Sequence, residues 1–299
     1  MKTYFKNIFY SVLIGTSILS CTEDITLPLD KTYARLVVDA IFTTDTTAHR
    51  VLLSRSGDAL NKEAIVPITG ANVIIISESD TFNLEPSPIT NGLYLTKPNV
   101  YGIPGKIYNL QISQVDIDDD GIFETYTAQS ELRKIAPIDS IELMFQQFGP
   151  ERKGYMLNLY GWDIGGRNYY LTKALINDTL ITDSIKEYGY TNNAGFDGKY
   201  YPGLGVYYLN DNKPDEKLQI GDKVTLELNS ITEEYFNFVD GFQQELRPKV
   251  PIFSGPSANV ITNINPKDKA VGFFTAYSIY RASTIFWGDS TLIPPVNPF

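Results

Sequence analysis

Short stretches in which apolar and polar residues alternate follow one another along most of this chain, and they constrain its fold more than any other feature. In the segment 36–42, Leu36, Val38, Ala40 and Phe42 fall on one face of an expected strand, and in 108–112 Tyr, Leu and Ile alternate with Asn and Gln. Successive side chains of a β-strand point to opposite faces, so this alternation is typical of half-buried strands. Gly, Pro, Asn and Asp separate the stretches, as expected of turns. The sequence therefore predicts an all-β protein.

The spacing of these strands predicts two domains. About seven strands fit between residues 34 and 134, which is typical of an immunoglobulin-like or transthyretin-like β-sandwich. Arg133 and Lys134, shortly before Pro137, indicate a junction, and residues 138–299 are predicted to form a second β-rich domain. Within it, Ser230-Ile231-Thr232-Glu233 matches the S-x-x-E capping box. Apolar residues follow at helical spacing, so we expect one amphipathic helix over 232–246.

The N-terminus has the features of a processing segment. Lys2 and Lys6 precede an apolar run over 8–19, which is shorter than the roughly 20 residues that a membrane-spanning helix needs. Residues 1–20 are therefore predicted to be a signal peptide. Ile18-Leu19-Ser20-Cys21 resembles a bacterial lipobox, in which cleavage leaves the cysteine as an acylated N-terminus. We expect lipidation, with palmitate among the acyl chains, at Cys21 and a tether over 21–33; the alternative is an ordinary secretory signal.

Composition excludes several classes of function. The chain has 25 Lys+Arg against 35 Asp+Glu, a net charge of -10, so no nucleic acid partner is expected. With one Cys and one His, the chain has no pair for an internal disulfide and no set for a Cys/His zinc site. A Ser-His-Asp machinery would have to use His49, which we expect to be an exposed or half-buried strand residue. The chain carries no phosphate-binding loop or nucleophile elbow, so we predict that it is not an enzyme.

An acidic motif lies at residues 116–121. It has the pattern D-x-D-x-D-G, the first half of a calcium loop in which closely spaced carboxylates supply oxygen ligands. The candidate calcium ligands are Asp116, Asp118, Asp120 and Glu124. The twelfth position is Thr127, where such a loop needs a bidentate Glu, and the flanks are predicted strands. The alternative is a plain hairpin turn at Asp120-Gly121.

A tyrosine-rich stretch is the second candidate. Tyrosine offers a rigid apolar ring with a polar tip, which suits recognition of a glycan, a peptide or a partner protein. The predicted binding surface comprises Tyr188, Tyr190, Phe196, Tyr200, Tyr201, Tyr207 and Tyr208. The alternative is a long connection whose rings pack on the protein's own sheets.

Several short motifs together resemble one family. They are Val51–Ser56, Pro67–Val73, Gly105–Leu110, Ile138–Ile141, Asn168–Tyr170, Gly255–Val260 with Asn263-Ile264, and Gly272–Ser278. In this order and after a lipobox, they resemble the Bacteroidota outer-membrane lipoproteins of the domain-of-unknown-function type (DUF 4249). The chain departs from that pattern where Asp116–Asp120 lengthens a hairpin. The resemblance implies a lipoprotein that is often encoded near TonB-dependent transporters, and it supplies no activity.

These observations lead to one expected function. We predict a non-catalytic lipoprotein of the outer membrane, an accessory or ligand-presenting partner of a TonB-dependent transporter. Glu23 and Asp24 behind Cys21 resemble the signal for the outer face, so we expect the protein to face the cell exterior. The alternatives are a structural or adhesive surface module without a transporter partner and, less favoured, a glycan hydrolase with two carboxylates.

Overall fold

The computed structural model describes residues 34–57, 65–78, 80–149, 151–247 and 260–288. The predicted signal peptide, the lipidation site Cys21 and the predicted tether over 21–33 lie outside these residues. Among the helices of the described part, none is long and apolar enough to cross a membrane. The described residues group into one compact unit that is mostly β-strand, which confirms the predicted fold class.

The first half is built from eight strands. They are β1 (Leu36–Thr43), β2 (Arg50–Arg55), β3 (Val66–Pro67), β4 (Asn72–Ile76), β5 (Thr81–Pro86), β6 (Leu93–Leu95), β7 (Ile107–Val115) and β8 (Glu124–Glu131). Along the sheet their order is β1-β2-β6-β5-β4-β7-β8, with β3 on β2. The alternation in β1 is confirmed, because Leu36, Val38 and Ala40 are buried in the first core together with Leu110 of β7.

The second half contributes two further sets of strands. β9 (Ile138–Gln147), β10 (Lys153–Trp162) and β14 (Tyr200–Asn210) form a three-stranded sheet. β11 (Tyr169–Ile176), β12 (Thr179–Leu180), β13 (Gly189–Asn192) and β15 (Lys223–Ile231) belong to the large sheet, as does β16 (Ala270–Ile285). Leu157 and Leu209 of the small sheet pack against Ala174 and Leu226 of the large one in a second core.

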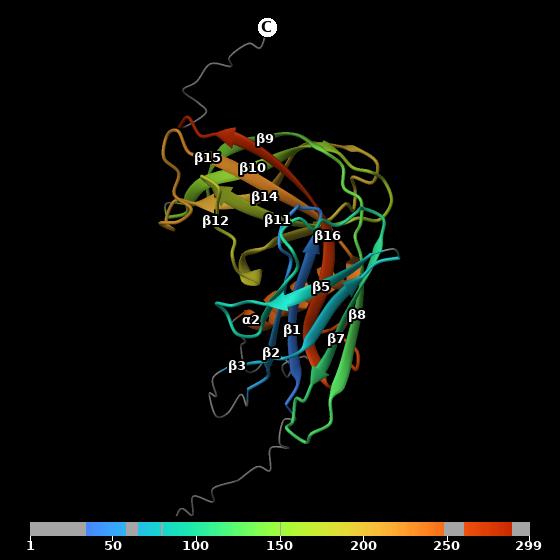
Figure 1. Ribbon diagram of the computed structural model, residues 1–299. Coiled ribbons are helices and arrows are strands. Elements are labelled where there is room, and N and C mark those ends of the chain that lie inside the picture. The colour runs from blue at the N-terminus through green and yellow to red at the C-terminus, as the bar shows by residue number, and fades with distance from the viewer. Residues whose placement is uncertain (1–33, 58–64, 79, 150, 248–259, 289–299) are drawn as a thin grey trace, which may run out of the picture. The chain divides into compact units, whose positions relative to one another are not determined.

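Strand β16 connects the two halves. Its residues Ala270–Tyr277 pair in parallel with β1, and its residues Ser278–Ile285 pair antiparallel with β15 (Figure 1). Ile264 and Phe274 consequently lie in the first core. The Asn263 side chain reinforces the link, because its amide bonds the backbone N–H and C=O of Phe274 at 3.0 and 2.8 Å. The boundary between 34–134 and 138–299 stays a prediction, and the structure adds that residues from the end of the chain complete the first core.

Helix α2 (Glu233–Leu246) confirms the predicted helix but not its predicted cap. Its N-cap is Thr232, whose hydroxyl accepts the backbone N–H of Tyr235 at 3.2 Å. Ser230, the first residue of the predicted capping box, is still in β15, where its buried hydroxyl has no partner among the described residues. The strand continues to Ile231 because that side chain is buried under the helix, in the third core with Tyr235 and Val239.

The tyrosine-rich stretch is not the long loop expected from its sequence. It contains a 3-10 turn, η2 (Ile185–Glu187), and the strands β13 and β14. β14 pairs with β10 along its length, with register shifts at two points. Gly203 lies at one of these irregular stretches with a φ of +93°, which only glycine adopts readily. The glycines that weaken the periodic pattern are therefore part of an irregular strand.

Candidate functional site

Helix α2 and the segment 183–188 cover one face of the large sheet. A pocket of about 430 Å³ lies between this cover and the strands β1 and β16. We call the covered side of the sheet the helix-side face. Paired residues of neighbouring strands share a face, and so do residues an even number of positions apart in one strand. By this rule the helix-side face carries Lys173, Glu227, Arg281, Thr275 and Asp39. The volume falls in the range of about 300–1,000 Å³ that is usual for small-molecule sites. The pocket is therefore large enough for a small organic ligand.

The floor of the pocket comes from two strands that are distant in sequence. Asp39 and Ile41 of β1 stand opposite Phe273 and Thr275 of β16 in the parallel register. Their neighbours Val38 and Ala40 point the other way, into the first core. Residue alternation in β1 thus separates the sandwich core from the pocket.

The cover of the pocket is aromatic and held in place by hydrogen bonds. Tyr235, Phe238 and Phe242 recur at helical spacing on α2 and line the cavity. The Gln243 side-chain amide donates to the carbonyl oxygens of Ile185 and Tyr188, both at 2.8 Å. These two bonds fix the segment 183–188 against the helix and so set the width of the pocket.

Few polar groups face this apolar lining. Arg50 and Asp39 form an ion pair at 2.8 Å and are each about half exposed, with side-chain exposures of 47% and 48%. The Asp183 carboxylate is exposed and has no ion-pair partner among the described residues. Thr275 is 1% exposed, and its Oγ1 has no hydrogen-bond partner within the described part of the chain. Burial raises the pKa of the Tyr235 hydroxyl, so this group is neutral at physiological pH.

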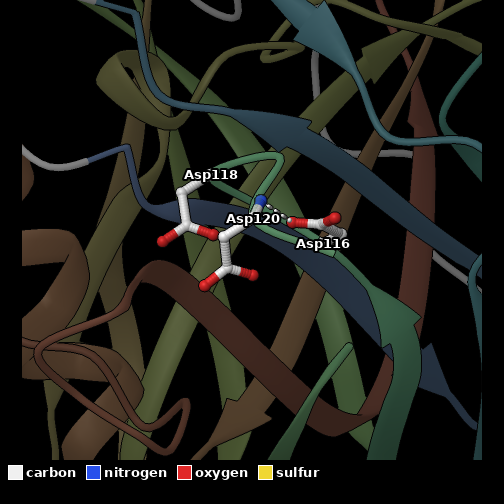
Figure 2. Close-up of side chains that lie close together, drawn as sticks. All are labelled: Asp116, Asp118 and Asp120. Carbon is white, nitrogen blue, oxygen red and sulfur yellow. Dashed lines mark hydrogen bonds between the residues drawn. The ribbon is translucent and has the colours of Figure 1, made fainter. Parts of the chain in front are cut away.

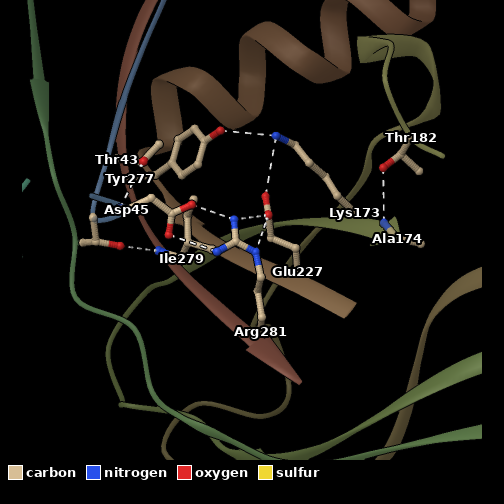
Figure 3. A network of polar contacts seen from close by, with 10 residues as sticks. Thr43, Asp45, Lys173, Ala174, Thr182, Glu227, Tyr277, Ile279 and Arg281 are labelled. Carbon is tan, nitrogen blue, oxygen red and sulfur yellow. Dashed lines mark hydrogen bonds and ion pairs between the residues drawn. The ribbon is translucent and has the colours of Figure 1, made fainter. Parts of the chain in front are cut away.

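Figure 3 shows an ionic network whose members Lys173 and Glu227 are buried, whereas Arg281 and Asp45 are partly exposed. Arg281 donates two bonds to Asp45, at 2.9 and 2.7 Å, and reaches Glu227 Oε2 at 2.6 Å. Lys173 Nζ lies 3.8 Å from Glu227 Oε1 and donates to the Tyr277 hydroxyl at 3.2 Å. The hydrogen bond to Asp45 is the main reason why the pKa of Arg281 is raised. Two cations and two anions balance one another here.

The network also positions an aromatic wall of the pocket. Lys173 Nζ lies 4.7 Å from the ring centre of Tyr188 and 5.5 Å from that of Tyr277. An ammonium group is attracted to the face of an aromatic ring, so Lys173 holds Tyr188 against the sheet. Asn229, two residues from Glu227 along β15, is fully buried, and neither polar atom of its amide has a partner among the described residues.

The acidic motif forms the tip of the β7–β8 hairpin, as the hairpin alternative expects. Carboxylate oxygens of Asp116, Asp118 and Asp120 lie within 4.8 Å of one another (Figure 2). Both oxygens of Asp116 accept backbone N–H groups, from Asp120 at 3.1 Å and from Gly121 at 2.9 Å. These bonds stabilise the turn, and each Asp116 oxygen keeps a second lone pair.

Glu124, the fourth predicted calcium ligand, does not join this cluster. Its Oε1 pairs with Lys269 at 2.6 Å, and its Oε2 accepts the Tyr126 hydroxyl at 3.2 Å. Calcium takes six to eight oxygen ligands, so with one oxygen from each Asp the remaining ligands would have to be second carboxylate oxygens, backbone carbonyls or water. Calcium binding stays a prediction, and calorimetry tests it: heat at millimolar calcium that Asp118→Ala removes supports a site, and no heat leaves only the turn.

The predicted tyrosine surface is divided among separate places. Tyr188 lines the pocket, and Tyr190 bonds Asp240 of α2 at 2.7 Å. Tyr207 bonds the buried Glu216 at 3.3 Å, and Arg152 lies over the ring of Tyr208. Most of these tyrosines therefore pack on the protein itself.

The remaining members lie near the ends of β10 and β14. Tyr201 is buried with Phe196 against its ring, whereas Tyr200 is 37% exposed and meets Trp162, which is 60% exposed. The two exposed rings have centroids 5.4 Å apart. Of the seven residues of the predicted surface, all of which the structure describes, Tyr200 is the one whose side chain is exposed.

Asp163 organises this region and was missed from the sequence. Its carboxylate accepts five hydrogen bonds, each of 2.9 Å, from Tyr170, Tyr201, Asn193, Gly165 and Gly198. Burial opposes the ionised form, but the hydrogen bonds from Gly198, Asn193 and the two tyrosines outweigh it and lower the pKa of Asp163. The residue has no local sequence signal, because all of its partners except Gly165 lie seven or more positions away.

His49 is also placed differently from the expectation. It is buried, with its ring 4.4 Å from that of Phe42. Nδ1 accepts the backbone N–H of Thr43 at 3.3 Å, so Nε2 carries the proton and donates to the Val100 carbonyl at 3.2 Å. His49 is a structural residue that joins two loops of the first core.

Comparison with known proteins agrees with the resemblance that the motifs indicated. The family model described as "Domain of unknown function (DUF4249)" matches residues 22–283. No curated protein matches the chain. The matched segment begins directly after Cys21 and includes every strand of both halves, with β16 ending two residues beyond it. The chain therefore belongs to the DUF4249 family.

Proposed function

We propose that this protein is a non-catalytic lipoprotein of the bacterial outer membrane, anchored through Cys21 and facing the cell exterior. It acts as an accessory of a TonB-dependent transporter and presents a small ligand that it holds in the pocket between α2 and the helix-side face.

The pocket is the observation that carries this proposal. Its volume of about 430 Å³ suits a small molecule, and its lining combines phenylalanine and tyrosine rings with a few polar groups. Binding sites typically have this mixture, in which apolar walls supply affinity and the polar groups fix orientation. The covering segment is held by the bonds of Gln243, so the site is preformed.

The sequence supports the membrane location. Ile18–Cys21 resembles a lipobox, and two or more acyl chains give stable anchoring. In this proposal the predicted tether over 21–33 joins the lipid anchor to the folded part.

An affinity pull-down tests the partnership. The tagged full-length protein is recovered from outer membranes in mild detergent, and bound proteins are identified by mass spectrometry. We expect a TonB-dependent transporter in near-stoichiometric amount. The Cys21→Ser variant is the matched control, because it keeps the folded part and removes the acylated sulfur; it should recover much less transporter. Recovery of the lipoprotein alone would overturn the proposal of a stable complex.

The exposed aromatic pair favours a second candidate, an adhesive surface module. Trp162 and Tyr200 offer ring faces on which a sugar can stack, next to loops that Asp163 holds rigid. This function predicts that Trp162→Ala weakens binding to surface glycans on an array, and that the pull-down recovers no transporter with the wild type. Equal glycan binding by the wild type and the variant would remove this candidate.

A further inference from the structure

The charges around the pocket do not cancel. Arg50 is paired with Asp39 at 2.8 Å, whereas Asp183 has no ion-pair partner among the described residues. The adjoining network of Lys173, Glu227, Arg281 and Asp45 is balanced in itself. One negative charge on the pocket wall is therefore uncompensated, on a chain whose net charge is -10. The electrostatic field favours a cationic ligand over an anionic one.

The aromatic lining points to the same class of ligand. Tyr188, Tyr235, Phe238, Phe242 and Phe273 all contribute to the pocket. The faces of such rings carry partial negative charge and attract ammonium groups, and aromatic cages of this kind bind organic cations. Lys173 demonstrates this attraction within the protein, since its ammonium lies over Tyr188 and Tyr277.

One hydroxyl group without a partner among the described residues completes the site. Thr275 is 1% exposed, lines the pocket, and its Oγ1 has no partner among the described residues. A buried polar group without a hydrogen bond is costly, and it is usual only where a ligand or an ordered water supplies the partner. The Thr275 hydroxyl can accept a hydrogen bond from an ammonium group and can also donate one, so it offers a polar contact to a ligand while Asp183 and the ring faces select the charge.

We propose that this pocket binds a small organic cation, an ammonium group carried on an apolar body. The ammonium lies toward the Asp183 carboxylate, and the apolar body packs on Phe238, Phe242 and Phe273. This inference rests on the proposed function because it concerns the same pocket. It adds the chemical class of the ligand that the pocket holds.

Calorimetric titration with three matched probes tests the inference. The full-length protein in nanodiscs of zwitterionic lipid is titrated with 2-phenylethylammonium, 2-phenylethanol and 3-phenylpropionate, and empty nanodiscs give the blank. The probes share a phenylethyl body and differ in charge. We expect the cation to bind at least about tenfold more tightly than the other two, because one uncompensated charge and the ring faces together supply about 1.4 kcal/mol.

Two variants assign the binding to this pocket. Asp183→Asn should lower the affinity for 2-phenylethylammonium by roughly fivefold and leave that for 2-phenylethanol unchanged. Asp268→Asn is the matched control; Asp268 is an exposed acid outside the pocket lining, so the same loss of charge should leave all affinities unchanged. Thr275→Val keeps the shape of the side chain and should weaken the cation about threefold or more.

The outcomes separate this inference from the proposed function. Three results would overturn the proposal that the ligand is a cation. They are no heat from the cation, equal affinity for all three probes, and a preference for 3-phenylpropionate at Arg50. Binding of 2-phenylethanol alone would overturn it too, while retaining a ligand pocket. The titration contains no transporter, and the pull-down contains no probe. A failure of cation binding therefore does not imply a failure of transporter binding, and the reverse also holds.

Discussion

Val38 and Gly272 face each other across the parallel pair of β1 and β16, and a β-carbon on Gly272 would overlap the carbonyl oxygen of Val38. Gly272 has a φ of +92°, which a residue with a side chain rarely adopts. The same glycine lines the pocket, opposite the helix. Close approach of β16 to β1 at this point connects the two halves and shapes the floor of the site.

Gly272→Ala should strongly destabilise the fold. The positive φ costs about 1–2 kcal/mol, and the overlap with Val38 adds about 1–3 kcal/mol of strain. We expect a loss of roughly 3 kcal/mol in the free energy of unfolding, measured by urea denaturation. Gly70→Ala is the matched control, because Gly70 has a φ of +79° but no atom near its would-be β-carbon. Equal losses in the two variants would show that the contact with Val38 is unimportant.

The network beside the pocket predicts an asymmetry between its two most buried members. Lys173 and Glu227 side chains are each 8% exposed, but Glu227 also binds Arg281. Glu227→Gln leaves the Lys173 ammonium buried without a carboxylate and should cost about 3 kcal/mol. Lys173→Met leaves Glu227 paired with Arg281 and should cost no more than about 1 kcal/mol. Equal losses in thermal or urea unfolding would contradict this account.

The sequence predicts those parts of the fold that depend on local pattern. Residues two positions apart share a face of a strand, so Leu36, Val38 and Ala40 are predicted to lie together, and Asp39 on the opposite face marks theirs as the core face. The apolar spacing after Thr232 predicts α2 for the same reason. In both cases neighbouring residues carry the whole signal.

The pairing of β16 with β1 is not predictable in this way. Thr275 and Ile41 are partners across 234 positions of sequence, and nothing in either segment specifies the other. The pocket floor depends on that pairing, so its residues could not be found as a group. Phe238 and Phe242 do belong to the predicted apolar face of the helix, but the sequence does not distinguish a ring that lines a cavity from one that fills a core.

The sequence could not decide between the two interpretations of the tyrosine-rich stretch, because the hydrogen-bond partners of these tyrosines are distant along the chain. The Tyr201 hydroxyl donates to Asp163, and the Tyr190 hydroxyl donates to Asp240. No local sequence pattern indicates either hydrogen bond. A cluster of tyrosines therefore resembled a binding surface, although most of its members are structural. Trp162, which lies outside the cluster, provides most of the exposed aromatic surface beside Tyr200.

Asp163→Ala should destabilise the second half of the protein. The substitution leaves five donors without their acceptor, among them the buried hydroxyls of Tyr170 and Tyr201. We expect a loss of about 3 kcal/mol or more in urea unfolding. Asp197→Ala removes an exposed acceptor from the same region, for Gly166, and should cost less than about 1 kcal/mol.

The same residue contributes to acid sensitivity. Its pKa is lowered from 3.8 in the folded state, so the unfolded chain binds a proton more readily. The contribution of Asp163 to stability is therefore complete above pH 3.8 and is lost as the pH falls through the folded value. The stability difference between wild type and Asp163→Ala, measured by urea unfolding, should shrink between pH 5 and pH 3. A difference that stays constant over this interval would contradict the ionised role.

His49 predicts a second, separate dependence on pH. Burial lowers the pKa of His49 from its ordinary 6.5, so below that value the unfolded chain takes up a proton that the folded chain resists. Stability should be constant above about pH 7 and should fall below pH 6.5, by at most about 1.4 kcal/mol per pH unit, until the folded pKa is reached. The chain has one His, so no other side chain with an ordinary pKa titrates in this interval.

The variant His49→Asn tests this assignment. It keeps an acceptor for the Thr43 N–H and does not titrate, so its urea-unfolding stability should be flat from pH 7.5 to 5.5 even if it is lower throughout. A slope in this variant equal to that of the wild type would mean that His49 is not the group responsible.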